Sequence, residues 1–168
     1  MNLFDGATLI SESSDESFMR LALEQACCAA SHDEVPIGAV IVYDNRVIGW
    51  GYNLTRRLQD ATAHAETVAL RQAAQRLGHW YFNECTLYVT VEPCVMCAGM
   101  MILGHLARLV YGAREPKFGC CGSLYDLVRD PRFNHRVEVT SGVLAVESEQ
   151  LLKAFFRKLR AVNNHSEC

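Results

Sequence analysis

The chain has 168 residues, of which 50% are hydrophobic and 21% are charged, and its formal net charge is −3. This length suits one compact domain, and the composition excludes a disordered chain, a collagen-like repeat and a coiled coil. No apolar stretch approaches the ~18 residues that a membrane-spanning helix needs. The first residues lack the basic start and apolar run of a secretory signal. We therefore expect a cytoplasmic protein that does not associate with membranes.

The eight cysteines do not form the regular pattern of a disulfide framework. Cys27-Cys28 and Cys120-Cys121 are adjacent pairs, and the remaining spacings are irregular. We expect reduced thiols, a subset of which binds metal or takes part in catalysis. We interpret Cys120 and Cys121 as small packing residues rather than as metal or redox groups.

The predicted elements alternate between helices and strands. A helix begins near Asp15 and ends near His32, with apolar residues at helical spacing. Two apolar runs joined by Asp44-Asn45 predict a β-hairpin, because both turn residues tolerate a positive φ. The elements expected after the hairpin are a helix over 63–77, a strand over 86–91, a helix over 94–103, a strand over 109–111, a strand over 137–139 and an amphipathic helix marked by apolar residues over 151–159.

This order of elements predicts an α/β fold, a three-layer α/β/α sandwich around a central mixed sheet of five strands. We expect a flexible N-terminal tail over 1–14, a single domain over 15–163 and a C-terminal tail over 164–168. The final helix has an apolar stripe that we expect to face the core, formed by Leu152, Phe155 and Leu159. It also carries a basic cluster, formed by Lys153, Arg157, Lys158 and Arg160.

Two short motifs stand where helices are predicted to begin. His64 and Glu66 form a His-x-Glu motif, and Pro93 opens a Pro-Cys-x-x-Cys motif that contains Cys94 and Cys97. The two thiols lie on one helical face at a helix N-terminus, which favours their thiolates. With His64 as third ligand, one corner of a tetrahedral zinc site stays open, as in catalytic sites. The alternatives for the separate parts are a redox-active cysteine pair, half of a zinc ribbon, a buried histidine and a surface glutamate.

Together the motifs form the pattern of zinc-dependent nucleobase deaminases. After residue 17 almost the whole chain resembles the bacterial tRNA-specific adenosine deaminases of the cytidine and deoxycytidylate deaminase superfamily. The segments that carry the resemblance are Glu34 to Val40, Ala61 to Glu66, Leu87 to Gly99, Gly119 to Leu124, Asn134 to Glu138 and Phe155 to Arg157. The zinc motifs indicate only the superfamily, and the downstream segments point to the tRNA-specific family.

The resemblance implies a cytidine deaminase-like fold and hydrolytic deamination of adenosine to inosine at the wobble position of an arginine tRNA with an ACG anticodon. It also implies one Zn²⁺ per subunit, bound by His64, Cys94 and Cys97. Zinc lowers the pKa of a bound water to about 7, so that hydroxide is available at neutral pH. Glu66 would take the water proton, deliver it to the ring nitrogen beside the attacked carbon and later protonate the leaving ammonia.

The resemblance further implies contacts with the anticodon loop. Asn53 would hydrogen-bond the target nucleoside, and Val35 and Pro36 would line the base pocket. Phe156 and Arg157 of the final helix would stack on the loop and pair with its phosphates. Alternatively, Asn53 ends its strand, Pro36 opens one and the basic helix is a solvated face.

The segment after Tyr111 departs from the family pattern. Glu115 stands where the family usually has Asp, an acid implicated in contacting the nucleic acid near the target, and Phe118 takes a position usually held by Thr. Glu115 keeps the charge but adds a methylene, a change that can alter strand preference or loop geometry. We expect Glu115 and Lys117 to contact the substrate.

Two other classes of function share parts of this pattern. A small-molecule deaminase acting on free guanine, cytosine or a nucleoside uses the same zinc chemistry, and the four motif residues do not discriminate it. The basic final helix favours RNA, whereas the mild acidity of the whole chain argues weakly against it. Glu66, two positions from His64, disfavours a non-enzymatic zinc-bearing RNA-binding module. The resemblance also implies a homodimer, with Met100, Met101 and Ile102 as apolar candidates for either the interface or the core.

Overall fold

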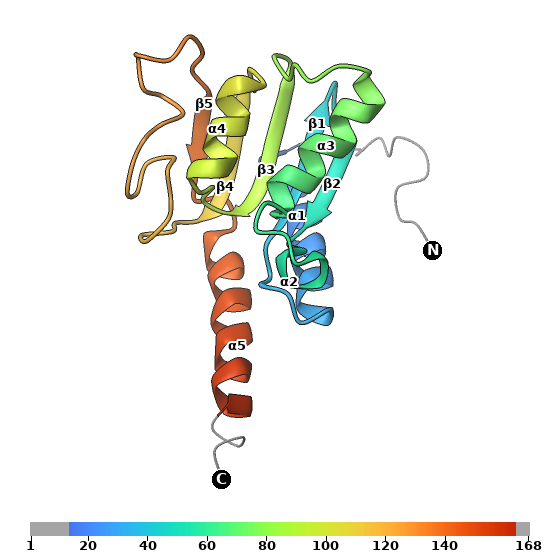
Figure 1. Cartoon of the computed structure of the whole chain (residues 1–168), viewed down its shortest axis with the longest axis vertical. Coiled ribbons are helices and arrows are strands. Elements are labelled where there is room, and N and C mark those ends of the chain that lie inside the picture. Colours follow the sequence, from blue (N-terminus) through green and yellow to red (C-terminus); the bar gives the residue numbers. More distant parts are fainter. Residues whose placement is uncertain (1–13, 164–168) are drawn as a thin grey trace.

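The computed structural model describes residues 14–163, so the predicted tails over 1–14 and 164–168 lie outside the described residues apart from Ser14. The elements follow one another along the chain in the predicted order, with one addition, α2 (Figure 1). Their bounds are α1 (Asp15–Ser31), β1 (Gly38–Tyr43), β2 (Arg46–Tyr52), α2 (Thr55–Leu58), α3 (Ala65–Leu77), β3 (Cys85–Val91), α4 (Val95–Leu103), β4 (Arg108–Ala113), β5 (Glu138–Ser141) and α5 (Ala145–Asn163).

The strands form one mixed sheet in the order β2-β1-β3-β4-β5. β1 pairs antiparallel with β2 and β3, whereas β3 and β4, and β4 and β5, are parallel. The prediction of a mixed sheet of five strands is therefore confirmed. The turn between β1 and β2 contains Asp44 (φ 48°) and Asn45 (φ 56°), the left-handed conformations that these two residues predicted.

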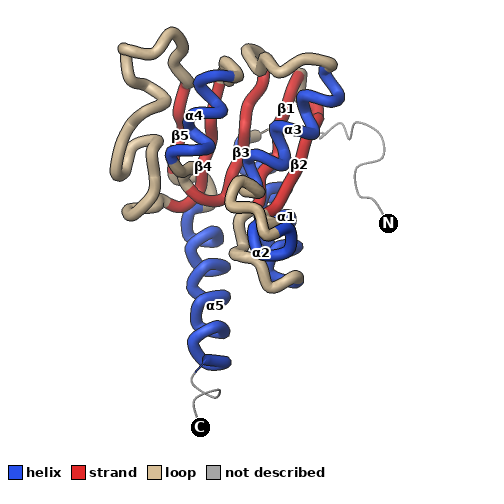
Figure 2. The backbone as a smooth tube through the Cα atoms, viewed as in Figure 1, coloured by secondary structure: helices blue, strands red, loops and turns tan. Residues whose placement is uncertain are grey.

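Helices cover both faces of the sheet (Figure 2). On one face α3 and α4 pack on alternate residues of the central strands, such as Ile41, Leu87 and Leu109. The intervening residues, such as Val40 and Tyr88, face α1 on the other side, where α5 also contacts β3 and β4. Because successive side chains of a strand point to opposite faces, the central strands bury apolar side chains on both. The layers form the predicted α/β/α sandwich.

Two glycines allow α3 to lie directly on β2. A Cβ at Gly49 would lie 2.4 Å from the carbonyl oxygen of Ala69, and one at Gly51 would lie 2.7 Å from that of Ala65. Only a residue without a side chain permits this approach. The first turn of α3, which carries Glu66, is therefore held tightly against the sheet.

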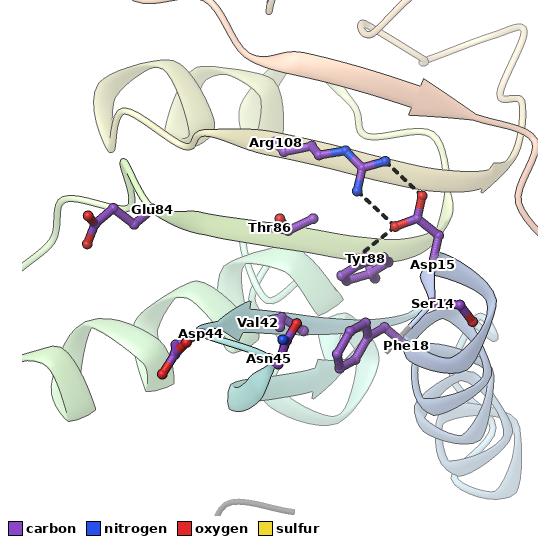
Figure 3. A pocket seen from close by; sticks show the side chains of 10 residues that line it. All are labelled: Ser14, Asp15, Phe18, Val42, Asp44, Asn45, Glu84, Thr86, Tyr88 and Arg108. Atoms are coloured by element: carbon purple, nitrogen blue, oxygen red, sulfur yellow. Dashed lines mark hydrogen bonds and ion pairs between the residues drawn. The ribbon is translucent and has the colours of Figure 1, made fainter. Parts of the chain in front are cut away.

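A polar cluster fixes the start of α1 on the opposite side of the sheet (Figure 3). The Asp15 carboxylate accepts two hydrogen bonds from the Arg108 guanidinium, at 2.8 and 2.7 Å, and one from the Tyr88 hydroxyl at 3.0 Å. The bonds from Arg108 hold the pKa of Asp15 below its usual range. The charges of Asp15 and Arg108 are paired with each other, which gives the cluster a structural role.

Burial tests several expectations from the sequence. Cys120 and Cys121 are buried in the core shared with α3 and α4, which agrees with the interpretation of these two cysteines as packing residues. All cysteines within residues 14–163 are free thiols. In the stripe of α5, Phe155 is buried, whereas Leu152 and Leu159 are only half-buried. No helix among the described residues is both long and apolar enough to cross a membrane.

Candidate active site

Two helix starts bring the predicted metal ligands together. His64 is the N-cap residue of α3, Cys94 is the N-cap residue of α4, and Cys97 lies in the first turn of α4. Both helices lie on the same face of the sheet (Figure 1). The two helices begin one or two residues later than predicted, because His64 and Cys94 keep the extended backbone of a cap.

The three side chains have the spacing of a tetrahedral metal site. The His64 Nδ1 atom lies 3.6 Å from the Sγ atom of Cys94 and 3.6 Å from that of Cys97, and all three ligand atoms lie within 4.8 Å of one another. Tetrahedral zinc, with bonds of about 2.3 Å to sulfur and about 2.0 Å to nitrogen, places the two kinds of ligand atom about 3.6 Å apart. The donor set therefore fits a metal ion without rearrangement.

The pKa values of the side chains in the cluster favour the binding of a cation. A hydrogen bond from Cys97 is the main cause that lowers the pKa of the Cys94 thiol to about 4, with a further contribution from His64. The same hydrogen bond, together with burial, raises the pKa of Cys97. The hydrogen bond to Cys94 also raises the pKa of His64. The cysteine pair thus holds one thiolate beside an imidazole, and thiolates are the form of cysteine that binds metals.

Glu66 lies in the first turn of α3, beside this cluster. Its side chain is 4% exposed, and this burial raises the pKa of its carboxyl above the usual range. The charge of His64 and hydrogen bonds to its own backbone amide and to Cys97 oppose that effect. A carboxyl group with a raised pKa can both accept and donate a proton near neutral pH.

A cavity of about 420 Å³ opens onto the cluster and Glu66. Its lining residues are Ile37, His64, Glu66, Val91, Glu92, Cys94, Val95, Glu115 and Phe118. Of the substrate contacts expected from the sequence, Glu115 lines this cavity, whereas Val35, Pro36 and Asn53 do not. The sequence did not predict the apolar lining residues Ile37, Val91 and Val95. Two signals were present, since Ile37 follows Pro36 directly and Val95 lies inside the cysteine motif.

Asn53 is buried, and its backbone amide donates to the carbonyl of Ile37, a residue that lines the cavity, at 3.0 Å. Its side chain is held by another buried residue, Glu34. The Asn53 Nδ2 atom donates to Glu34 Oε2 and to Thr55 Oγ1, both at 3.0 Å. The Glu34 carboxylate also accepts from the backbone amides of Arg56 at 3.3 Å and Arg57 at 2.7 Å. Glu34 therefore fixes both the orientation of the Asn53 amide and the position of α2.

The remaining predicted contacts lie on the surface. Lys117 is exposed, and its backbone amide donates to Glu115 Oε1 at 2.9 Å. Phe156 and Arg157 are exposed on α5 and do not line the cavity. Nearby, Lys158 pairs with Asp33 at the end of α1 at 3.4 Å, which joins α5 to the surface around α2.

Comparisons with known proteins agree with this site. Residues 13–160 match the family of MafB19-like deaminases. The chain is 46% identical over 146 residues to a tRNA-specific adenosine deaminase of Bacillus subtilis, which covers 87% of this chain and 91% of that protein. A tRNA-specific adenosine deaminase of Haemophilus influenzae is 48% identical over 147 residues, 87% of this chain and 85% of that protein.

A solved structure from studies of A-to-I editing by tRNA:A34 deaminases at the wobble position of transfer RNA has the same fold. Its TM-score is 0.78 at 45% identity, over 81% of this chain and 99% of that chain. A His/Cys/Cys cluster beside a buried glutamate is the arrangement of metal-dependent nucleobase deaminases. Within that class, the chain belongs to the family of tRNA-specific adenosine deaminases.

Proposed function

We propose that the protein converts adenosine to inosine by hydrolysis at the wobble position of an arginine tRNA with an ACG anticodon. The observation that carries this proposal is the placement of buried Glu66 beside the cluster of His64, Cys94 and Cys97. Glu66, His64 and Cys94 line one cavity. Membership of the family supports adenosine in tRNA as the substrate rather than a free base or nucleoside.

His64, Cys94 and Cys97 would hold one Zn²⁺ per subunit, which supplies an activated water at neutral pH. Glu66 accepts a proton from the attacking water and delivers it to the ring nitrogen beside the attacked carbon. Glu66 then takes the proton of the new hydroxyl group and passes it to the exocyclic nitrogen, the bond from that nitrogen to the carbon breaks, ammonia leaves, and the carbon keeps the oxygen as a carbonyl. The raised pKa of Glu66 supports this double role.

The cavity suits a purine that has left the anticodon stack. Ile37, Val91 and Phe118 provide apolar surface for its ring, and an unpaired loop base is extruded at low cost. Asn53 would contact the nucleoside through the amide oxygen, because its Nδ2 atom is already engaged.

Beyond the cavity, Val35 and Pro36 would support the base pocket, and Glu115 and Lys117 would contact the RNA beside the target. Phe156 and Arg157 of α5 are exposed, as stacking on the loop and pairing with its phosphates require.

The organisation of the molecule is part of the proposal. A single domain over 15–163, with tails over 1–14 and 164–168, would act in the cytoplasm as a homodimer. Of the apolar residues considered for the interface, Met101 and Ile102 are buried in the core, and Met100 is half-buried. The neighbouring Leu103, 73% exposed, extends the apolar surface of α4 that remains for a second copy. Light scattering that gives a monomer at working concentration contradicts the dimer.

The first test is incubation of zinc-loaded protein with an arginine tRNA bearing an ACG anticodon, followed by an assay for inosine at the wobble position. We expect inosine with the native protein and formation at least about 100-fold slower with Glu66→Gln, which keeps the metal. A tRNA with G at the wobble position serves as the matched substrate control. Absence of inosine with zinc bound and the fold intact contradicts the proposal and redirects the assay to free bases and nucleosides.

A further inference from the structure

Glu92 lies at the end of β3, two residues before Cys94, and its side chain is 3% exposed. Its Oε1 atom accepts hydrogen bonds from the backbone amides of Cys121 at 3.0 Å and Ser123 at 2.9 Å. Its Oε2 atom accepts from the backbone amide of Glu115 at 3.1 Å and from the Ser123 hydroxyl. All four groups are donors, and a carboxylate is the side chain whose two oxygens satisfy them together.

We call the segment over residues 114–123 the pocket loop. Its main chain also lies directly on the turn that carries Cys94, because the Cys120 amide donates to the Pro93 carbonyl at 2.8 Å and Gly119 forms a β-bridge with Cys94. A Cβ at Gly119 would lie 2.6 Å from Glu92 Oε2. The loop backbone is therefore pressed against the Glu92 carboxylate, with no room for a side chain between them.

The pocket loop forms one wall of the cavity that contains Glu66. Glu115 and Phe118 line that wall, and Phe118 is 68% exposed, so its own packing does little to hold it. The position of the wall is instead set from beneath, by the bonds to Glu92. Glu92 itself needs no part in proton transfer, because every donor around it is a structural group of the loop.

We propose that Glu92 is the positioning residue that holds the pocket loop in its substrate-binding conformation and thereby sets the affinity for the target nucleotide rather than the rate of the chemical step. This inference rests on the proposed deamination of an RNA base, since that reaction gives the cavity its substrate. The role of Glu92 in holding the pocket loop does not depend on the roles proposed for the metal ligands or for Glu66.

Glu92→Gln is the sharpest test, because the substitution keeps the size of the side chain. The amide oxygen can still serve Cys121 and Ser123, but the amide nitrogen then faces the backbone N–H of Glu115, donor against donor. Glu24→Gln, on the exposed face of α1, is the matched control with the same change of charge. The measurements are metal content, site-resolved hydrogen exchange of the free protein, and kcat and KM with an anticodon stem-loop RNA.

For Glu92→Gln we expect full metal content and amide exchange at Glu115 faster by about 10-fold or more, because a buried hydrogen bond to a charged group is lost. We expect KM to rise by about 10-fold and kcat to stay within about 3-fold of the native value. Exchange equal to that of Glu24→Gln overturns the proposal. A fall in kcat at unchanged KM also overturns it, because it places Glu92 in the chemical step.

Two further variants keep the test decisive if Glu92→Gln loses its metal or does not fold. Ser123→Ala removes only the hydrogen bond from the hydroxyl, so it should raise the amide exchange rate at Glu115 and KM by less than Glu92→Gln does. Gly119→Ala should push the loop away from Glu92 and raise KM. Unchanged exchange and KM in both variants contradict the proposal. Failure of the native protein to deaminate the RNA defeats the proposed function, while the exchange data still decide whether Glu92 holds the loop.

Discussion

Glu66 and Glu34 are both almost fully buried near the cavity, yet their surroundings differ in kind. Four donors surround the Glu34 carboxylate, two of them backbone amides of α2, so it holds neighbouring segments together. Glu66 lies beside the metal-ligand cluster, and burial raises its pKa. The difference teaches that a buried carboxylate bonded to donors from several segments holds those segments in place, whereas one beside a metal-ligand cluster has a raised pKa that suits proton transfer.

The same contrast separates two regions of the site. We call His64, Glu66, Cys94 and Cys97 the floor. We call the walls the two segments held by buried glutamates, residues 53–57 beside the cavity and the pocket loop. Groups of the floor are expected to govern metal binding and turnover, whereas Glu34 and Glu92, which hold the walls in place, are expected to govern shape and affinity. The variants below test this division, from the largest expected effect to the smallest.

Cys97→Ala should abolish metal binding and turnover together, because it removes a buried ligand of the floor. Elemental analysis and the inosine assay measure both effects. Cys85→Ala is the matched control, since burial raises the pKa of that thiol to about 11 and it lies at the far end of β3. A variant at Cys97 that keeps its metal contradicts the assignment of the floor.

Glu66→Gln should lower kcat by about 10²–10⁴-fold while leaving metal content and melting temperature close to native, because only the proton-transfer group is lost. Single-turnover kinetics with the stem-loop RNA measure the effect. If Glu66→Gln also lowers the free energy of unfolding by about 1–3 kcal/mol, as expected for Glu34→Gln, then Glu66 is a structural residue like Glu34.

Glu34→Gln should lower the free energy of unfolding by about 1–3 kcal/mol, because one amide nitrogen then faces the donors of Asn53 or α2. Metal content should not change. Urea denaturation followed by circular dichroism gives the free energy, with Glu24→Gln as the control, whose change should stay within about 0.5 kcal/mol. If Glu34→Gln does not change the free energy of unfolding, Glu34 has no structural role, and its contrast with Glu66 is wrong.

Asp15→Asn, far from the site, should cost about 0.5–1 kcal/mol at pH 7, because the paired side chains are partly exposed. The folded pKa of Asp15 is lowered, so its stabilisation is complete above the unfolded value of about 3.9 and is lost as the pH falls through the folded value. Denaturation at pH 7 and at several values between about pH 2 and pH 5 should therefore show the difference between native and variant protein disappearing. A difference that persists at the lowest pH contradicts this interpretation.

The floor could be predicted from the sequence because its parts are local. Cys94 and Cys97 are one helical turn apart, and His64 begins a helix with Glu66 in its first turn, so the spacing within each motif predicts how its side chains lie on their helix. The hairpin turn at Asp44-Asn45 was equally local.

The walls depend on partners that are distant in the chain. α2 has four residues and no buried side chain, so no periodicity marks it, and the carboxylate that holds it lies in Glu34, some twenty positions earlier. The link from Glu92 to Ser123 spans a helix and a strand. Such contacts become visible only when the chain is folded, which is why the sequence did not predict that Glu34 holds Asn53 or that Glu92 holds the pocket loop.

The pocket loop is anchored through backbone amides and the single hydroxyl of Ser123, and this has a consequence for how the enzyme can change over time. The side chains of Glu115, Lys117 and Phe118 take no part in the bonds to Glu92. Selection or a designer can therefore exchange these three side chains to alter which bases are accepted, while the scaffold beneath them and the chemistry beside them stay intact.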